Sequence, residues 1–190
     1  MEYNNDVLNY DVKQHYKEGC INTMSGRLIN LLKPDLNDIV LRDIASGLSK
    51  KAHYSGQTKN YFSIAQHSIL VSKLIENDFP NDYKLQLAGL MHDAAEAYIG
   101  DMVSPIKSMF PLFKTIENDL THAIFEKFEM NISLMPKIKP YDNYILKLEY
   151  MTFYLGYDHL INEYLNADQA ELFFNVRFNT LIHKINSKKR

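Results

Sequence analysis

The stretch from Leu85 to Tyr98 constrains the fold most, because it places the adjacent pair His92 and Asp93 inside an otherwise largely apolar segment. A helix that is apolar on most of its surface has to be covered by other elements, and polar groups are seldom buried without partners. Glu96 lies one helical turn beyond the pair, so three polar groups crowd one side of this helix. We therefore expect a core helix whose polar side chains meet partners from other helices.

The rest of the chain is helical in pattern almost throughout from Ser25 onward, since apolar residues recur at spacings of three and four. Capping residues, prolines and glycines divide the pattern into helices. We expect a short helix from Ser25 to Pro34, one capped by Asn37 or Asp38, one beginning near Ser63, one over roughly 83 to 98 stopped by Gly100, and three over about 112 to 128, 141 to 156 and 168 to 186.

The segments between these helices predict loops at Lys50 to Asn60 and Asp101 to Pro111, and residues 1–24 form an irregular N-terminal arm. No alternating pattern of a β-hairpin stands out. The sequence therefore predicts an all-α fold, a compact single-domain helical bundle.

Length and charge exclude several classes of protein. The 190 residues fit one domain, and a net charge of −2 gives no general attraction to nucleic acid or to anionic membranes. Cys20 is the only cysteine, which excludes an intrachain disulfide and a cysteine-based zinc site. The start resembles no signal peptide, and no apolar run is long enough for a membrane span. We expect a cytoplasmic protein.

Two further metal-capable residues fall at inward positions of other predicted helices. His67 shares a face with apolar residues of the helix that begins near Ser63, and Asp142 does so at the start of the helix over 141 to 156. Together with His92 and Asp93 they offer two imidazoles and two carboxylates. This set suits one divalent transition metal, Mn, Co, Fe, Ni or Zn, with Mg as a further option.

Single residues of this kind usually have a structural role, and a lone histidine on an apolar face is most often a core residue with a hydrogen-bond partner. The ordered set of four carries the metal prediction. Four histidines lack comparable partners in the sequence and are expected at the surface: His15, His122, His159 and His183. Glu117 and Glu149 are also expected to have surface roles, whereas His53 is a partial exception.

Three segments resemble a known family of enzymes. Gln66-His67-Ser68, the run His-Asp-Ala-x-Glu with Gly-Asp and Pro-x-Lys from His92 to Lys107, and Tyr141-Asp142 are similar to the HD-domain metal-dependent phosphohydrolases. The likeness is to the small bacterial and phage branch that holds 5′-deoxynucleotidases and deoxynucleoside triphosphate hydrolases. It covers about residues 40 to 155, and it implies an HD-type bundle over residues 25–190.

The resemblance also implies roles for individual residues. By it, the metal ligands are His67, His92, Asp93 and Asp142, and Glu96 is the catalytic acid or base. Asp101 matches a position that contacts or organises the sugar side of the substrate and that also takes part in catalysis. Lys107 matches one that meets phosphate.

The chain departs from the family shortly before the first ligand histidine. Active members carry an arginine and a bulky aromatic residue there, and the matching positions hold Ala52 and His53. Lys50, Lys51 or Lys59 could supply the cation, and His53 or Tyr54 the ring. We therefore expect His53 to contact substrate.

The leading hypothesis is a phosphohydrolase of small nucleotides, a 5′-(deoxy)nucleotidase that releases phosphate by attack of metal-bound water. The alternatives are a deoxynucleoside triphosphate triphosphohydrolase that releases tripolyphosphate, a non-catalytic metal-containing nucleotide sensor, and a helical interaction protein whose polar residues merely pack. The expected partner is a small nucleotide. A long nucleic acid is not expected, because the sequence shows no track of basic residues, and a membrane is not expected either. A homodimer or higher homo-oligomer is left open.

Overall fold

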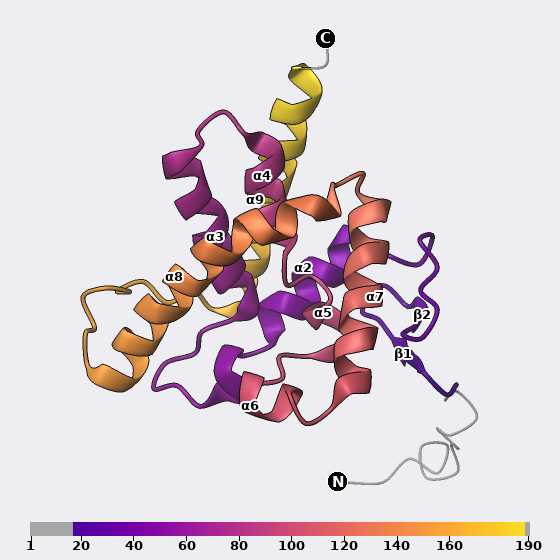
Figure 1. Cartoon of the computed structure of the whole chain (residues 1–190), viewed down its shortest axis with the longest axis horizontal. Helices are drawn as coiled ribbons and strands as arrows, with labels where there is room; N and C mark the ends of the chain where they lie inside the picture. The colour runs from indigo at the N-terminus through magenta and orange to yellow at the C-terminus, as the bar shows by residue number, and fades with distance from the viewer. Residues whose placement is uncertain (1–16, 189–190) are drawn as a thin grey trace, which may run out of the picture.

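The computed structural model describes residues 17–188, with only the backbone of Ser104, and shows a mostly helical chain (Figure 1). Residues 1–16 of the predicted N-terminal arm lie outside the described residues, as do residues 189–190. The elements are, in chain order, β1 (Cys20–Asn22), β2 (Leu28–Asn30), α2 (Leu41–Lys50), the 3-10 helix η2 (His53–Gly56), α3 (Ile64–Asp78), α4 (Tyr83–Met91), α5 (Glu96–Ile99), α6 (Ser104–Lys107), α7 (Pro111–Lys127), the 3-10 helix η3 (Ile132–Leu134), α8 (Met135–Leu155) and α9 (Ala167–Ser187).

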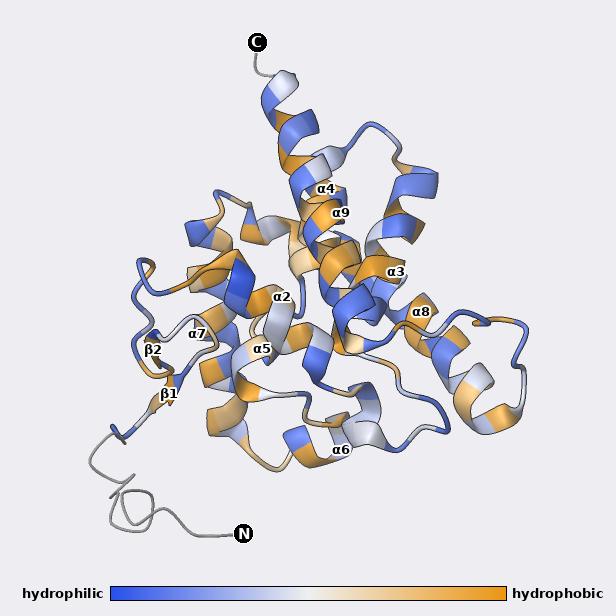
Figure 2. Ribbon diagram, turned by 180° about the vertical axis from the view of Figure 1, so that it is seen from behind, coloured by the Kyte–Doolittle hydropathy of each residue, from blue (hydrophilic) through white to orange (hydrophobic). Residues whose placement is uncertain are grey.

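The core forms around α4, whose residues from Leu85 to Met91 are all buried. α3, α8 and α9 pack against α4, and α2 packs against α3 and α9. Figure 1 shows α4 and α9 side by side in the upper half of the view, and Figure 2 shows the mixed hydrophobic and hydrophilic colouring of the helices around them. The predicted core helix is confirmed as far as Met91, and His92 and Asp93 follow its end.

α2 positions the short helix α5 through a close approach of the two backbones. A β-carbon on Gly47 would lie only 2.7 Å from the carbonyl oxygen of Ala97, so a larger residue would need a shift of the backbone. The ammonium group of Lys51 donates a hydrogen bond to the same carbonyl oxygen. Because Glu96 is the first residue of α5, these contacts help to fix the place of its carboxylate.

Side-chain caps mark two of the helix starts around the core. The hydroxyl group of Ser63 accepts a hydrogen bond from the backbone N–H of Gln66 at the start of α3. The carboxylate of Asp82 does the same for Leu85 at the start of α4. Such caps satisfy backbone donors that have no partner within the helix. The predicted start of α3 near Ser63 is confirmed.

The predicted helix from Ser25 to Pro34 is wrong, and the all-α prediction missed a short hairpin. β2 instead pairs antiparallel with β1, with Ile21 opposite Ile29. Ser25 does not cap a helix, because its N–H and its hydroxyl group both donate to the carboxylate of Asp43 in α2, at 2.8 and 2.7 Å. The strands are too short for an alternating pattern to show in the sequence.

The predicted continuous helix over 83–98 is interrupted at His92 and Asp93. α4 ends at Met91, a turn covers residues 92–95, and α5 follows. In this turn the N–H of Glu96 bonds to the carbonyl oxygen of Asp93, three residues back, rather than four. The tighter winding changes the direction in which the side chains point. Gly100 ends α5 with a φ of 83°, as a helix stop at that residue requires.

Three other boundaries differ from the prediction. α8 begins at Met135 rather than near 141, so Asp142 lies in its second turn. The predicted loop over 101–111 contains the short helix α6. Neither Asn37 nor Asp38 caps α2, which begins after Val40 without a side-chain cap. Across the described residues, none of the helices is both long enough and apolar enough to cross a lipid bilayer.

Candidate metal centre

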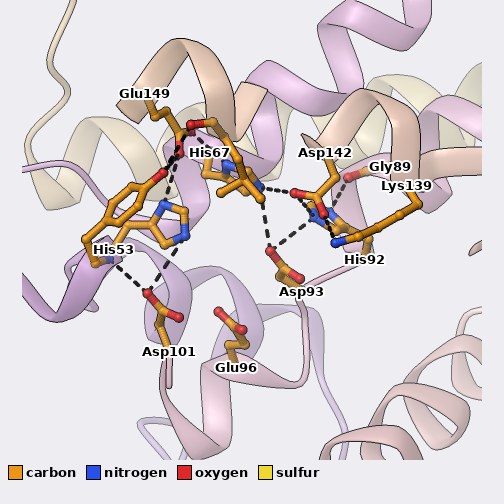
Figure 3. Close-up of polar contacts among 12 residues, drawn as sticks. His53, His67, Gly89, His92, Asp93, Glu96, Asp101, Lys139, Asp142 and Glu149 are labelled. Carbon is orange, nitrogen blue, oxygen red and sulfur yellow. Dashed lines mark hydrogen bonds and ion pairs between the residues drawn. The ribbon is translucent and has the colours of Figure 1, made fainter. Parts of the chain in front are cut away.

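The fold brings the four predicted ligands together from three helices (Figure 3). His67 comes from α3, His92 and Asp93 follow the end of α4, and Asp142 comes from α8. Asp142 Oδ1 lies 3.2 Å from His67 Nε2 and 3.7 Å from His92 Nε2. Asp93 Oδ2 lies 3.1 Å from His92 Nε2 and 3.6 Å from His67 Nε2. The two imidazoles and two carboxylates therefore face one point.

The outer nitrogen of each imidazole is held by a fixed acceptor. His67 Nδ1 donates to Glu149 Oε1 at 2.7 Å, and His92 Nδ1 donates to the carbonyl oxygen of Gly89 at 2.9 Å. These bonds leave both Nε2 atoms pointing inward. Within residues 17–188 neither Nε2 atom has a hydrogen-bond partner of suitable geometry. In metal sites, a histidine is oriented by the hydrogen bond that its other ring nitrogen donates, as Nδ1 of His67 and of His92 does here.

The donor set fits a divalent cation. The ligand atoms of His67, His92 and Asp142 lie within 4.8 Å of one another, and all three residues are buried. A neutral imidazole nitrogen facing a carboxylate oxygen is repelled unless a proton or a cation lies between them. A divalent ion would satisfy both Nε2 atoms and balance both carboxylates. This buried group could therefore hold a metal ion.

Without a metal, protons take the place of the cation. Burial opposes a charge on His92, but the carboxylates of Asp93 and Asp142 outweigh burial and raise its pKa to about 9. The pKa of His67 is also raised well above its usual value: burial opposes the charge, and Glu149 and Asp142 outweigh it. The imidazolium groups in turn hold the pKa of Asp142 below its usual value, although burial acts the other way. A metal must therefore displace protons to bind.

Glu149 is fully buried beside this centre, so the prediction of a surface role for it is wrong. Its Oε1 accepts from His67 Nδ1, while its Oε2 accepts from the hydroxyl group of Tyr54 at 2.9 Å and lies 3.3 Å from His53 Nδ1. Burial alone would favour a neutral carboxyl group, but the two histidines outweigh it and lower the pKa of Glu149 to about 2. An ionised Glu149 thus connects a predicted ligand to the loop at residues 53–56.

That loop is held in a strained shape over the site. Tyr54 and Ser55 both have a φ in the left-handed region, 55° and 53°, which non-glycine residues seldom adopt. The backbone N–H of Tyr54 donates to Asp101 Oδ2 at 2.9 Å, and His53 Nε2 lies 3.8 Å from the same oxygen. Asp101 therefore holds this loop, and its predicted role at the sugar side of the substrate stays a prediction. His53 is 7% exposed and borders the adjoining cavity.

Glu96 and Lys107 lie next to the four clustered side chains. Burial, followed by the charges of Asp93 and Asp101, raises the pKa of Glu96 to about 9 in the absence of a metal. Lys107 Nζ lies 3.6 Å from Glu96 Oε1 and 2.7 Å from Glu117 Oε1. Glu117 therefore pairs with a site lysine.

A cavity of about 520 Å³ opens beside the centre and contains most of the predicted site residues. Its walls include the predicted residues His53, His67, Asp93, Glu96, Asp101, Lys107 and Asp142, together with Tyr54, Met102, Val103, Pro105, Lys139, Leu146, Tyr150 and Tyr154. A slightly larger hollow of about 610 Å³ lies between α3, α4 and α8. None of the predicted site residues lines that hollow.

The expected replacements for the missing arginine point elsewhere. Lys51 donates to a backbone carbonyl of α5, Lys50 lies 3.9 Å from Glu171 of α9, and Lys59 borders a different hollow. The cavity instead contains Lys139, whose Nζ donates to Asp142 Oδ2 at 2.7 Å. Sequence reasoning missed this residue, although it lies one helical turn before Asp142.

Comparison with known proteins identifies relatives of the chain. No protein-family profile matches it. Over 129 residues it is 33% identical to the uncharacterized protein YfdR of Escherichia coli (strain K12), an overlap that covers 68% of this chain and 69% of YfdR.

The chain belongs to the YfdR family. A second relative, the uncharacterized protein RCAP_rcc00048 of Rhodobacter capsulatus, is 37% identical over 120 residues, which is 61% of either chain. The chain thus spans less than two thirds of that second relative. The names of these two relatives specify no activity.

Proposed function

We propose that the protein is an HD-type metal-dependent phosphohydrolase that acts on small nucleotides, as a 5′-(deoxy)nucleotidase that releases phosphate. One observation carries the proposal. The inward Nε2 atoms of His67 and His92 lie without hydrogen-bond partners, among the residues described, and face the carboxylates of Asp93 and Asp142 beside an open cavity. The run from His92 to Lys107, on which the family resemblance rests, supplies the other polar groups of that cavity.

The four ligands would hold one divalent ion, with Mn, Fe, Co, Ni or Zn favoured by two nitrogen and two oxygen donors. Such an ion supplies Lewis-acid polarisation of a phosphoryl group and lowers the pKa of water. Asp93 is the ligand nearest to the opening, since its side chain is 27% exposed and that of Asp142 only 9%. Substrate would reach the ion from the side of Asp93.

Glu96 would act as the general acid that protonates the leaving group. Its carboxyl group lines the cavity, is buried and holds its proton at neutral pH in the metal-free protein, since its pKa is raised to about 9. As the general acid of the loaded enzyme, this carboxyl group would donate a proton to the leaving 5′-oxygen as the bond to phosphorus breaks, and would regain a proton from the attacking water. Lys107, 3.6 Å from Glu96 Oε1, offers a positive charge to the phosphate.

A nucleotide sensor that does not catalyse hydrolysis is the second candidate, and it is favoured by the ion pairs that the lysines of the cavity form. In the part of the chain that the structure describes, the lysines of the cavity are Lys107 and Lys139, and each lies 2.7 Å from a carboxylate. Charges neutralised in this way hold phosphate less tightly than a free arginine fork does. A triphosphohydrolase would need to hold a longer anionic chain with the same lysines.

A product assay separates these functions. Purified protein is loaded in turn with Mn, Co, Zn or Mg and incubated with deoxyribo- and ribonucleotide mono-, di- and triphosphates, and phosphate and tripolyphosphate are measured separately. We expect phosphate from monophosphates. Tripolyphosphate would instead assign the triphosphohydrolase, and nucleotide binding without turnover would assign the sensor. Metal uptake without binding or turnover of any nucleotide would overturn the proposal.

A further inference from the structure

One face of α8 lines the cavity from the predicted metal ligand outward. Asp142, Leu146, Tyr150 and Tyr154 follow one another at intervals of four residues, and all four border the cavity. Residues four apart lie on the same side of a helix. With a rise of about 1.5 Å per residue, Tyr150 lies about 12 Å along the helix axis from Asp142. That separation is on the scale of one nucleoside.

The cavity changes its chemical character along this face. The end near Asp142 holds charged groups, among them Asp93, Glu96 and Lys107. Farther along the same face come the apolar side chain of Leu146 and the rings of Tyr150 and Tyr154, and the cavity walls also include the apolar side chains of Met102, Val103 and Pro105. A ligand that fits both ends carries a phosphate at one end and a flat apolar group at the other.

The two tyrosine rings form an aromatic wall. Their centroids lie 5.2 Å apart with an interplanar angle of 42°. The ring of Tyr154 meets Tyr54 edge-on at 5.9 Å, and its hydroxyl group donates to the carbonyl oxygen of Gln57 at 2.9 Å, so Tyr154 is tied to the loop. Tyr150 is 54% exposed. Its ring therefore leaves surface available for a ligand, and the ring of Tyr154 packs against it.

We propose that Tyr150 and Tyr154 form a nucleobase subsite, and that Tyr150 is the specificity-determining residue that stacks on the base. This inference rests on the proposed function. It adds that the protein recognises the base of the nucleotide, so that sugar phosphates without a base are poorer substrates. Stacking on an aromatic ring tolerates every base, because each base has a π-face. The larger rings of purines bury more surface than those of pyrimidines, so purine nucleotides bind more tightly.

The test compares a nucleotide with the same molecule lacking its base. KM and kcat are measured with Mn-loaded protein for dAMP and for deoxyribose 5-phosphate, in wild type, Tyr150→Ala, Tyr150→Phe and Tyr144→Ala. Tyr144 is the matched control, a tyrosine of α8 with 52% exposure that borders the other hollow. Tyr150→Ala raises KM for dAMP by about 5- to 150-fold, the range that loss of one base stack produces, and leaves kcat unchanged.

In the same experiment Tyr150→Ala leaves KM for deoxyribose 5-phosphate unchanged, Tyr150→Phe restores wild-type KM for dAMP, and Tyr144→Ala changes neither substrate. Equal kcat/KM for both substrates in the wild type, or an equal loss for both in Tyr150→Ala, would overturn the subsite.

Binding of both compounds by calorimetry is measured alongside, so that the subsite is tested without turnover. If the wild type hydrolyses neither compound with any metal, the nucleotidase proposal fails. In that case selective loss of dAMP affinity in Tyr150→Ala still supports the subsite, and unchanged dAMP affinity overturns it.

Discussion

Glu149 Oε1 accepts a hydrogen bond from His67 Nδ1 at 2.7 Å, and the other oxygen of the same carboxylate accepts one from the Tyr54 hydroxyl group. One buried anion therefore orients a predicted metal ligand and anchors the loop above the cavity. A single residue of α8 thus links the predicted metal ligand His67 to the position of the loop.

Glu149→Gln is expected to weaken metal binding by about 10- to 100-fold, the usual effect of losing a carboxylate that orients a ligand histidine. The amide has nearly the same shape but no charge to hold His67. Metal affinity is measured by competition with a chelator, with circular dichroism to verify folding. Glu171→Gln, which removes a carboxylate of α9 paired with Lys50, serves as the control. Equal affinities of Glu149→Gln and wild type would contradict the role assigned to Glu149.

The wild-type protein is expected to bind one transition metal per chain, and Asp142→Asn is expected to lose it. The loss of one carboxylate removes both a donor and the charge that balances the cation. Elemental analysis measures the stoichiometry, and thermal unfolding with added Mn, Co or Zn measures the stabilisation, about 2.7 kcal/mol at a metal concentration of 100 times Kd. Full occupancy in Asp142→Asn would remove Asp142 from the ligand set.

Glu96 is expected to make the metal-free protein less stable as pH rises. The folded protein keeps the proton of Glu96 up to about pH 9, whereas the unfolded chain loses it near 4.5. Stability from this group is therefore complete below pH 4.5 and is lost as pH rises toward 9.

Glu96→Gln cannot ionise, so with chelator present its Tm should match that of the wild type near pH 4.5 and exceed it at pH 9. Each 1 kcal/mol corresponds to about 2–4 °C for a domain of this size. A Tm difference that does not change with pH would show that Glu96 is ionised in the folded protein.

The same substitution should slow the metal-loaded enzyme by about 10²- to 10⁴-fold, the scale of a general acid or base. Glu96→Gln should keep its metal, because Glu96 is not one of the four predicted ligands. Turnover and metal content are measured on one sample. Wild-type turnover in this variant would make Glu96 a structural residue.

Lys107→Ala is expected to raise KM for every nucleotide, by roughly 10-fold for a loss of about 1.4 kcal/mol of phosphate binding. Lys59→Ala is the control, because Lys59 borders a different hollow although its place in the sequence suggested a substrate contact. If both variants keep wild-type KM, phosphate is held by other groups, and Lys139 becomes the first to examine.

Several features of the site could be predicted because they depend on spacing along one helix. Apolar periodicity placed His67 and Asp142 on inward faces, and the apolar surroundings of His92 and Asp93 required burial with partners. The structure brings these four side chains together. Capping at Ser63 and the stop at Gly100 are likewise local, since each depends on the conformation of a few consecutive residues.

Other features depend on which elements meet, and local spacing says nothing of that. Glu149 lies two turns after Asp142, but its burial is decided by the packing of α3 and the loop at 53–56 over α8. Lys50 and Lys51, at the end of α2, instead meet partners on α9 and α5, while Lys139 borders the cavity. Periodicity along the chain was enough to predict a helical bundle with a centre of two histidines and two carboxylates. The groups around that centre could not be predicted in this way, because contacts between segments distant in the chain follow from the packing of whole helices.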